Sequence, residues 1–314
     1  MFSAVTVIPS TDLDVFPLCL GGNVFGWTAN RTASFAVLDG FLSHGGNFID
    51  TADAYSAFAD GNSGGESETL IGEWLAARPG VRDRVLIATK VGKLPGLQGL
   101  APANIRAAAE ASLKRLQTET IDLYYAHADD RSVPLRDTLA AFSELVREGK
   151  VRHIAASNFT APRLAQALAT SDAEGLPRYV ALQPHYSLLE RGAYEGELAQ
   201  LCEREGIACF PYWGLAAGFL TGKYRPGGRE IDSPRAAWVE KHLNDRGLAV
   251  LAALDEVAAA HDAEVASVAL AWLLAKPSVL APIASARNPQ QLSPLFAATR
   301  IELSDEQLAK LDAA

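Results

Sequence analysis

Cysteine is scarce in this chain, and continuous positive charge is absent from it. Only Cys19, Cys202 and Cys209 occur, and none of them belongs to a Cys-x-x-Cys pair. This odd and widely spaced set excludes a disulfide framework or a metal knuckle and indicates reduced thiols in a cytosolic protein. The formal net charge of −9, with no lysine and arginine run, argues against a nucleic-acid or anionic-membrane surface but is compatible with a local basic pocket.

Long apolar runs are missing as well. Runs such as 268–275 fall well short of the roughly 20 residues that span a bilayer. Residues 1–15 have no positive segment and contain Asp12 and Asp14, which argues against a signal peptide. Hydrophobic residues make up 49% and charged residues 21% of the 314, as is typical of a well-packed soluble protein. We therefore expect a cytoplasmic protein without membrane or nucleic-acid partners.

Strand-like apolar runs alternate with amphipathic helical runs along the chain. The expected strands are 18–21, 47–50, 85–90, 121–127, 151–157, 179–183, 207–212 and 279–283. The expected helices are 32–44, 67–77, 102–116, 134–148, 162–169, 194–204, 247–261, 265–275 and 289–297, with a last one after residue 304. Alternation with short connections forces parallel strands and right-handed crossovers. Eight such steps within about 250–300 residues match the size of a closed barrel.

A doubly wound open sheet is the rival architecture. It usually carries a Gly-x-Gly-x-x-Gly turn after its first strand, and the run Gly-Gly-Asn-Val-Phe-Gly over 21–26 does not complete that pattern. We therefore predict an α/β fold that is a single (β/α)8 TIM barrel domain over 1–314. An N-terminal extension, a long irregular loop over 222–245 after the seventh strand and extra C-terminal helices are expected around it. A loop of that length in a compact fold is usually functional.

Three successive strands end on side chains that can carry out chemistry. They end on Asp50, Lys90 and His127, and Tyr55 follows the first of them by five residues. In a barrel of this type, the carboxyl ends of the strands build the active site. A lone lysine there is more often a solvated charge, and a lone histidine is more often a satisfied polar group. Their matched positions on three consecutive strands favour a functional role.

These residue types suit proton transfer to a carbonyl group. The reference pKa of tyrosine, near 10, makes it a poor proton donor and acceptor at neutral pH. A nearby Lys90 ammonium is expected to lower the pKa of Tyr55, and Asp50 is expected to hold Lys90 by an ion pair. His127 could then polarise a carbonyl oxygen or hold it against the Tyr55 hydroxyl. The set contains no obvious nucleophile and no metal triad.

Further motifs are spread along the chain between and after these four residues. They are Gly-Gly-Glu-Ser-Glu over 64–68, Ser-Asn-Phe over 157–159, Gln183, Tyr212, Gly-Phe-Leu-Thr-Gly-Lys-Tyr over 218–224 and Ile-Ala-Ser-Ala-Arg-Asn-Pro over 283–289. On these motifs, and on a match of Asp50, Tyr55, Lys90 and His127 to its catalytic tetrad, the sequence resembles the aldo-keto reductase superfamily. The resemblance implies an oxidoreductase that reduces an aldehyde or ketone to an alcohol, with hydride from NADPH and Tyr55 as general acid.

The same resemblance implies a nicotinamide site. The residues implied are Ser157, Asn158 and Gln183 for the carboxamide, Tyr212 for stacking on the ring, the backbone from Leu215 to Gly218 for the pyrophosphate, and Ser285 and Arg287 for the 2′-phosphate, with Gln291 close by. An amide needs donors and acceptors at fixed positions, and a flat ring needs an aromatic face. NADPH is expected over NADH because arginine suits the 2′-phosphate. Trp213 and Leu295 depart from the family pattern, replacing a serine and an asparagine that contact the cofactor.

Aromatic residues near the strand tips are candidates for a substrate wall. Trp27, Phe58 and Trp213 lie after the expected first, second and seventh strands, although ordinary loop packing is the alternative for the first two. The loops after strands 1, 2, 4 and 7 are expected to set the substrate. The oligomeric state stays open between a monomer and a small homo-oligomer.

Other polar residues near these strands have plainer explanations. Asp53 could compete with Asp50 for Lys90, but it falls in a loop. Glu66 and Glu68 are most simply charges that favour a helix N-terminus. His185, after the sixth strand, is expected to be a polar part of the scaffold.

Two alternatives from other classes remain open. A binding or sensor module, such as a cofactor-responsive regulatory subunit, would have slow or no turnover and a partner. A Schiff-base aldolase would use Lys90 as its nucleophile. In that case Asp50 would hold Lys90 in its charged form, and the nicotinamide set would have no task.

Overall fold

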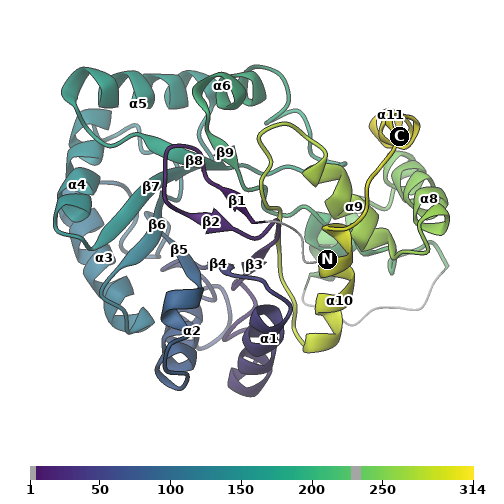
Figure 1. Cartoon of the computed structure of the whole chain (residues 1–314), viewed down its shortest axis with the longest axis horizontal. Coiled ribbons are helices and arrows are strands. Elements are labelled where there is room, and N and C mark those ends of the chain that lie inside the picture. Colours follow the sequence, from purple (N-terminus) through teal and green to yellow (C-terminus); the bar gives the residue numbers. More distant parts are fainter. Residues whose placement is uncertain (1–4, 228–234) are drawn as a thin grey trace.

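A parallel eight-stranded sheet forms the centre of the computed structural model, which describes residues 5–227 and 235–314. The strand order is β10-β3-β4-β5-β6-β7-β8-β9. The strands are β3 (Cys19–Gly21), β4 (Phe48–Asp50), β5 (Leu86–Val91), β6 (Ile121–Ala126), β7 (Val151–Ser157), β8 (Tyr179–Gln183), β9 (Ala208–Cys209) and β10 (Ile283–Ala284). Figure 1 shows the sheet curling around a centre with the helices outside it.

The two edges of this sheet are joined by the segment that leads into β10. The N–H of Cys209 in β9 donates to the carbonyl of Ser278 at 2.7 Å, and the N–H of Ile283 donates to the carbonyl of Pro211 at 2.9 Å. β10 in turn pairs in parallel with β3. The segment predicted as the eighth strand thus contacts β9 at its start and β3 at its end. The predicted (β/α)8 barrel is confirmed.

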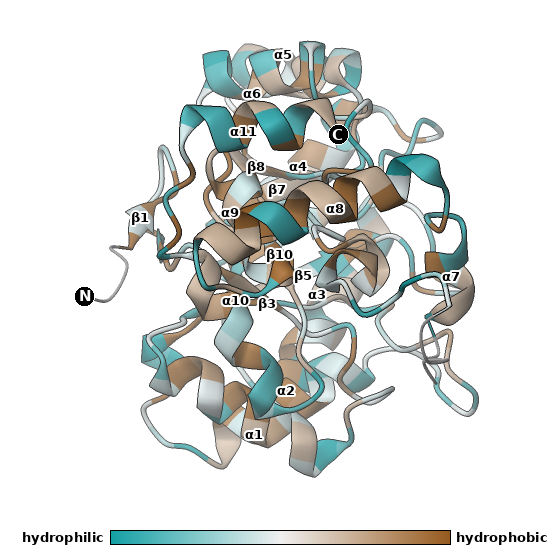
Figure 2. Cartoon of the chain, turned by 90° about the vertical axis from the view of Figure 1, so that its right-hand side faces the viewer, coloured by the Kyte–Doolittle hydropathy of each residue, from teal (hydrophilic) through white to brown (hydrophobic). Residues whose placement is uncertain are grey.

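Helices alternate with these strands and cover the outside of the barrel. They are α1 (Arg31–Ser43), α2 (Glu66–Ala76), α3 (Pro102–Leu116), α4 (Leu135–Arg147), α5 (Ala161–Glu174), α6 (Glu197–Glu205), α8 (Asp245–Ala260), α9 (Val265–Leu274), α10 (Leu292–Ala298) and α11 (Asp305–Ala313). Pro102 opens α3 at a position where its missing N–H costs nothing. The C-terminal helices α8 to α11 lie together on one side of the molecule (Figure 2).

The segment after β9 is more ordered than predicted. It contains the 3₁₀ helix η2 (Ala216–Thr221) and the short helix α7 (Ala236–Glu240). The prediction of an irregular loop over 222–245 is therefore wrong where α7 lies, and its part over 228–234 lies outside the described residues. A helix of five residues is too short to produce a recognisable periodic pattern in the sequence.

The predicted N-terminal extension forms an antiparallel hairpin of β1 (Thr6–Val7) and β2 (Asp14–Val15). Its apolar residues pack with the side chains that point into the barrel. Asn47, just before β4, donates to the carbonyl of Asp14 at 2.7 Å and accepts from the N–H of Phe16 at 2.8 Å. The hairpin therefore lies against the amino ends of the strands (Figure 1). The opposite ends remain for a functional site.

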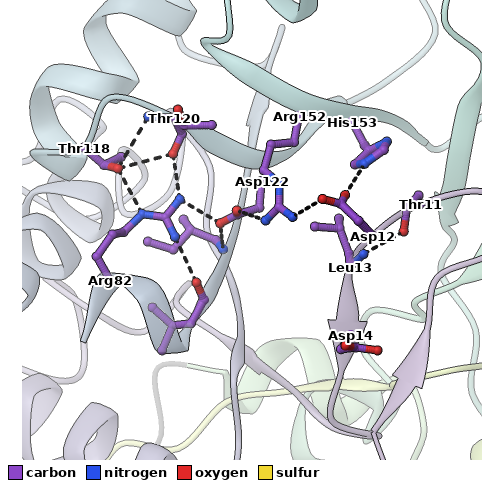
Figure 3. A network of polar contacts seen from close by, with 12 residues as sticks. Thr11, Asp12, Leu13, Asp14, Arg82, Thr118, Thr120, Asp122, Arg152 and His153 are labelled. Atoms are coloured by element: carbon purple, nitrogen blue, oxygen red, sulfur yellow. Dashed lines mark hydrogen bonds and ion pairs between the residues drawn. The ribbon is translucent and has the colours of Figure 1, made fainter. Parts of the chain in front are cut away.

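A polar network ties this hairpin to the barrel. Asp12 accepts hydrogen bonds from Arg152 at 2.7 Å and from His153 at 2.9 Å. Arg152 also donates to the buried Asp122 at 2.7 Å, and Asp122 accepts from Arg82 at 2.9 Å. Figure 3 shows this chain of contacts running from one carboxylate to the next.

No single helix of the described residues is long and apolar enough to cross a membrane. Within residues 5–227 and 235–314, α8 and α9 reach that length and composition only as a pair, with a bend of 94° between them.

Candidate active site

Asp50, Lys90 and Tyr55 form one hydrogen-bonded cluster at the carboxyl ends of β4 and β5. The Lys90 ammonium donates to both carboxylate oxygens of Asp50, at 2.6 and 2.7 Å, and to the carbonyl of Thr51 at 2.7 Å. It also lies 2.9 Å from the Tyr55 hydroxyl, which in turn donates to Asp50 at 3.0 Å. Lys90 and Asp50 are fully buried. The predicted meeting of these three side chains is present in the structure.

The strand register brings the three together. Asp50 pairs with Ala88, and Ala88 belongs to the cluster that fills the barrel. Lys90 lies two residues further along β5, so it points to the same side as Ala88 and reaches past the end of β4. A turn closed by the N–H of Tyr55 and the carbonyl of Ala52, at 3.2 Å, returns the phenol over the cluster.

Burial decides the ionisation of this cluster. Burial, followed by the negative charge of Asp50, raises the pKa of Tyr55 well above its usual value. The net shift of the Tyr55 pKa is therefore upward, opposite to the decrease expected from Lys90. Burial lowers the pKa of Lys90, and Asp50 opposes that change. The phenol consequently stays protonated at neutral pH, which is the form that a proton donor requires.

His127 lies beside this cluster, directly after β6. Its ring centroid is 6.1 Å from that of Tyr55, and the two rings are inclined at 76°. Its Nδ1 is buried without a hydrogen-bond partner in the described part of the chain. Burial, then the positive charges of Lys90 and Lys93, lower the pKa of His127 well below its usual value. The imidazole is therefore neutral at physiological pH.

One cavity of about 810 Å³ extends from this cluster across the carboxyl ends of the strands. Every residue predicted for the site lines it except Lys90, which lies beneath its floor. The cavity also contains residues that the sequence analysis did not single out, namely Asn23, Thr28, Lys93, Arg235, Trp238 and Glu264. Some lie in loops after the strands, whereas Arg235, Trp238 and Glu264 lie in or next to the helices α7 and α9, and neither periodicity nor a motif marks them.

The amide and hydroxyl groups predicted for a carboxamide are bonded to one another and to the cluster. The Nε2 of Gln183 donates to Asp50 at 2.9 Å, and Ser157 donates to the carbonyl of Gln183 at 2.9 Å. Asn158 donates to the carbonyl of His127 at 2.9 Å and accepts from the Tyr212 hydroxyl at 2.8 Å. Gln183 thereby connects this set to the carboxylate that holds Lys90.

Aromatic rings form one wall of the cavity. Trp27 meets Phe58 edge-on with ring centroids 4.8 Å apart and lies 6.2 Å from Trp238. Trp238 stacks on Trp213 at 5.7 Å. The structure thus brings together all three predicted aromatic residues and adds a fourth from α7. In the sequence, the one feature that marks Trp238 as a candidate cavity residue is its position in the segment after the expected seventh strand.

The face of Tyr212 is partly occupied. The His185 ring stacks on it with centroids 5.2 Å apart and planes inclined at 17°. The same imidazole meets Trp213 edge-on at 5.2 Å. His185 therefore orients two cavity rings, which is more specific than the scaffold role expected from the sequence.

Positive charge gathers at the end of the cavity near β10. Arg287 and Arg235 both line it, and the charge of Arg287 adds to burial in lowering the pKa of Arg235. The Gln291 side chain accepts from the backbone N–H of Arg287 at 2.8 Å, and Ser285 donates to Asn23 at 2.5 Å. Two guanidinium groups held close enough to repel each other are typical of an anion site.

The backbone beside Trp213 is in an uncommon conformation. Trp213, Ala216 and Ala217 have φ values of +57°, +46° and +57°, which residues other than glycine rarely adopt. The N–H of Gly218 donates to the carbonyl of Leu215 at 2.8 Å. The predicted contact of that particular amide with a pyrophosphate therefore conflicts with a hydrogen bond inside the turn.

Glu66 and Glu68 have different roles from each other. Glu66 accepts from the N–H groups of Ser63 and Gly64 before α2, in keeping with a helix-start residue. Glu68 is fully buried and accepts from Arg115 at 2.6 Å and from Thr89 at 2.5 Å. The prediction that Glu68 is simply a favourable helix charge is wrong, because its carboxylate is an internal ion-pair partner.

Fold and site together define a class of protein: a (β/α)8 barrel with a buried Asp–Lys–Tyr cluster beneath a long cavity at the carboxyl ends of its strands. The model of the aldo/keto reductase family matches residues 17–314. The chain therefore belongs to the aldo/keto reductase family and is an oxidoreductase of that family.

Three relatives match this chain over nearly its full length. The chain is 34% identical to Protein tas of Escherichia coli over 98% of this chain and 96% of that protein. It is 35% identical to the oxidoreductase YrpG of Bacillus subtilis over 98% and 94%. It is also 30% identical to an aryl-alcohol dehydrogenase of Pestalotiopsis microspora over 97% and 80%.

Proposed function

We propose that the protein reduces an aldehyde or ketone to an alcohol with NADPH, with Tyr55 as the general acid. The observation that carries this proposal is the Tyr55 hydroxyl at the cavity floor, 2.9 Å from the buried ammonium of Lys90. Tyr55 gives its proton to the carbonyl oxygen as that oxygen becomes negative. Lys90 then stabilises the remaining phenolate, and Asp50 holds Lys90 in place.

His127 completes this apparatus as a neutral group. Its ring faces that of Tyr55 edge-on, and its lowered pKa favours the uncharged imidazole. A neutral imidazole can donate a hydrogen bond to the carbonyl oxygen without competing with Tyr55 as an acid. In this proposal His127 orients the substrate, and Tyr55 transfers the proton.

The cavity residues fit a dinucleotide cofactor with a 2′-phosphate. Ser157, Asn158 and Gln183 offer amide and hydroxyl groups next to the cluster, while Arg287 and Arg235 provide positive charge at the other end. Bound there, NADPH would supply the hydride. Arg287 favours NADPH over NADH because a guanidinium suits a phosphate better than a ribose hydroxyl.

The four cavity aromatics support a flat, apolar carbonyl substrate. Trp27, Phe58, Trp213 and Trp238 present rings to the same space, and such rings pack favourably against another aromatic group. The aryl-alcohol dehydrogenase named above is a relative whose name points to the same class. A Schiff-base aldolase is less well supported, because three oxygen acceptors and the Tyr55 hydroxyl already surround the Lys90 amine.

Replacing Tyr55 by Phe tests the proposal. The variant keeps the ring but cannot give a proton, so turnover of an aromatic aldehyde with NADPH should fall by about 10²–10⁴-fold. NADPH binding, followed by quenching of its fluorescence, should change little. Tyr179→Phe is the matched control, because its buried hydroxyl has no partner among the described residues and its ring packs outside the barrel interior. Undiminished turnover in Tyr55→Phe would remove Tyr55 as the acid.

A further inference from the structure

Asp53 is a buried carboxyl group that the proposed reaction does not use. Its side chain is 1% exposed, in the loop between β4 and α2. Neither of its carboxyl oxygens has a hydrogen-bond partner among the described residues. Its backbone N–H donates to the carbonyl of Lys90 at 3.3 Å, which fixes the loop against β5. A buried ionised carboxylate is unfavourable without a partner, so this position requires an explanation.

The charges around Asp53 do not balance if every group is ionised. Three carboxyl groups and two cations lie close together at the cavity floor and behind it: Asp50, Asp53, Glu68, Lys90 and Arg115. Asp50 is matched by Lys90, and Glu68 by Arg115. Asp53 is the one left over. A single bound proton would remove the excess negative charge, and the carboxyl without hydrogen bonds is where that proton costs least.

The charged and titratable neighbours of Asp53 come from several elements around the loop. Lys90 belongs to β5, Glu68 to α2 and Arg115 to α3, while Tyr124 of β6 has a buried hydroxyl without a partner. Glu68 disfavours a negative charge on Asp53, whereas Arg115 and Lys90 favour it. The influence of Lys90 is mutual, since Asp53 acts to keep that amine charged.

We propose that Asp53 is a positioning residue, neutral in the resting site, whose ionisation secures the positive charge of Lys90. Burial and the charge of Glu68 raise the pKa of Asp53 to about 7. Burial meanwhile lowers the pKa of Lys90. As the pH rises, Asp53 becomes negative, and the new charge opposes the effect of burial on Lys90. The neutral form of Asp53 in the resting site does not depend on the proposed function, whereas the role of Asp53 in catalysis rests on it.

The neutral state is tested by stability, without any assay of activity. A carboxyl whose pKa is higher in the folded state binds an extra proton there, so its contribution to stability falls as the pH rises from about 4 to about 7. Asp53→Asn contributes no such change. The melting temperature of Asp53→Asn relative to the wild type should therefore increase steadily between pH 5 and 7 and level off above. Asp60→Asn, an exposed carboxyl in the same loop, is the matched control and should show a constant difference.

A difference in melting temperature that stays constant over this range would overturn the proposal. If Asp53→Asn does not fold, infrared spectroscopy of the wild-type protein replaces it. A carboxylic-acid carbonyl band should be present at pH 6 and disappear as the pH is raised through about 7. Its absence at pH 6 would equally overturn the neutral state.

The link to Lys90 is tested by the pH profile of reduction. In Asp53→Asn no negative charge forms behind Lys90, so the alkaline limb of kcat should move to lower pH by about one unit. The alkaline limb of kcat for Asp60→Asn should coincide with that of the wild type. If the alkaline limb of kcat does not shift in Asp53→Asn, Asp53 has no role in catalysis. Because the stability experiment needs no substrate, a failure of the proposed reductase activity is distinguishable from a failure of this inference.

Discussion

At the scale of single residues, the site depends on how deeply its charges are buried. The sequence identified Asp50, Tyr55, Lys90 and His127 because each stands at or just after a strand end, and strand ends are visible as breaks in apolar runs. It gave the wrong direction for the pKa of Tyr55, because the cost of burying a phenolate depends on tertiary packing. For the same reason Asp53 read as an ordinary loop residue. Position along a strand is a sequence property, but enclosure is not.

Removal of Lys90 should separate stability from activity. Lys90→Met leaves the Asp50 carboxylate buried without its partner, which should lower the free energy of unfolding by about 3–5 kcal/mol. The double variant Asp50→Asn with Lys90→Met has no unpaired charge and should recover much of that loss. Both should reduce carbonyl substrates far more slowly than the wild type. Urea titrations and steady-state rates measure the two effects, and equal stability of the single and double variants would contradict the charge argument.

At the scale of elements, the strands are predictable from the sequence more reliably than the segments between them. Strands 85–90, 151–157 and 179–183 were placed within a residue or two, because continuous apolar runs between turns are typical of buried parallel strands. The hairpin of β1 and β2 and the helix α7 were not resolved as elements, since strands of two residues and a helix of five leave too little pattern. Trp238 was missed with α7. The elements without a pattern are those that close the two ends of the barrel.

Of the two carboxylates in the polar network, the buried Asp122 should contribute more to stability than the exposed Asp12. Asp122 is nearly fully buried and accepts from two arginines and a backbone N–H, so Asp122→Asn should lower the free energy of unfolding by about 2 kcal/mol. Asp12 is 70% exposed, and Asp12→Asn should cost less than about 1 kcal/mol. Urea denaturation of both variants measures the difference. A larger loss for Asp12→Asn would reverse this order.

The lowered pKa of Asp12 sets the pH at which its small contribution to stability is lost. Hydrogen bonds from His153 and Arg152 lower the pKa of Asp12 to about 2. A carboxyl whose pKa is lower in the folded state stabilises it above the unfolded value of 3.8, and that contribution is lost as the pH falls toward 2. The contribution of Asp12 to stability is therefore intact throughout the neutral range.

At the scale of the whole molecule, net charge and local charge oppose each other. The chain has a formal net charge of −9, yet the proposed cofactor is itself an anion. The net charge argues against a nucleic-acid surface but is compatible with a basic pocket, and Arg287 with Arg235 provides positive charge at one end of the cavity. Arg287 was visible in a motif, whereas Arg235 precedes α7 and no pattern marks it. Charges more than about 10 Å away are largely screened at 0.1 M salt, so the near pair outweighs the distant excess.

The salt dependence of NADPH binding and the preference for NADPH over NADH should therefore both depend on Arg287. Raising the ionic strength shortens the screening length from about 10 Å at 0.1 M to about 3 Å at 1 M, and the dissociation constant of NADPH should rise accordingly. Arg287→Gln should weaken NADPH by about 10- to 100-fold, as expected for a hydrogen bond to a charged group, and should flatten its salt dependence. NADH, which lacks the 2′-phosphate, is the matched ligand and should respond less to both changes. Fluorescence titrations at two salt concentrations measure all four cases. If NADPH and NADH weaken in parallel, Arg287 does not contact the 2′-phosphate, and the positive end of the cavity serves the pyrophosphate common to both cofactors.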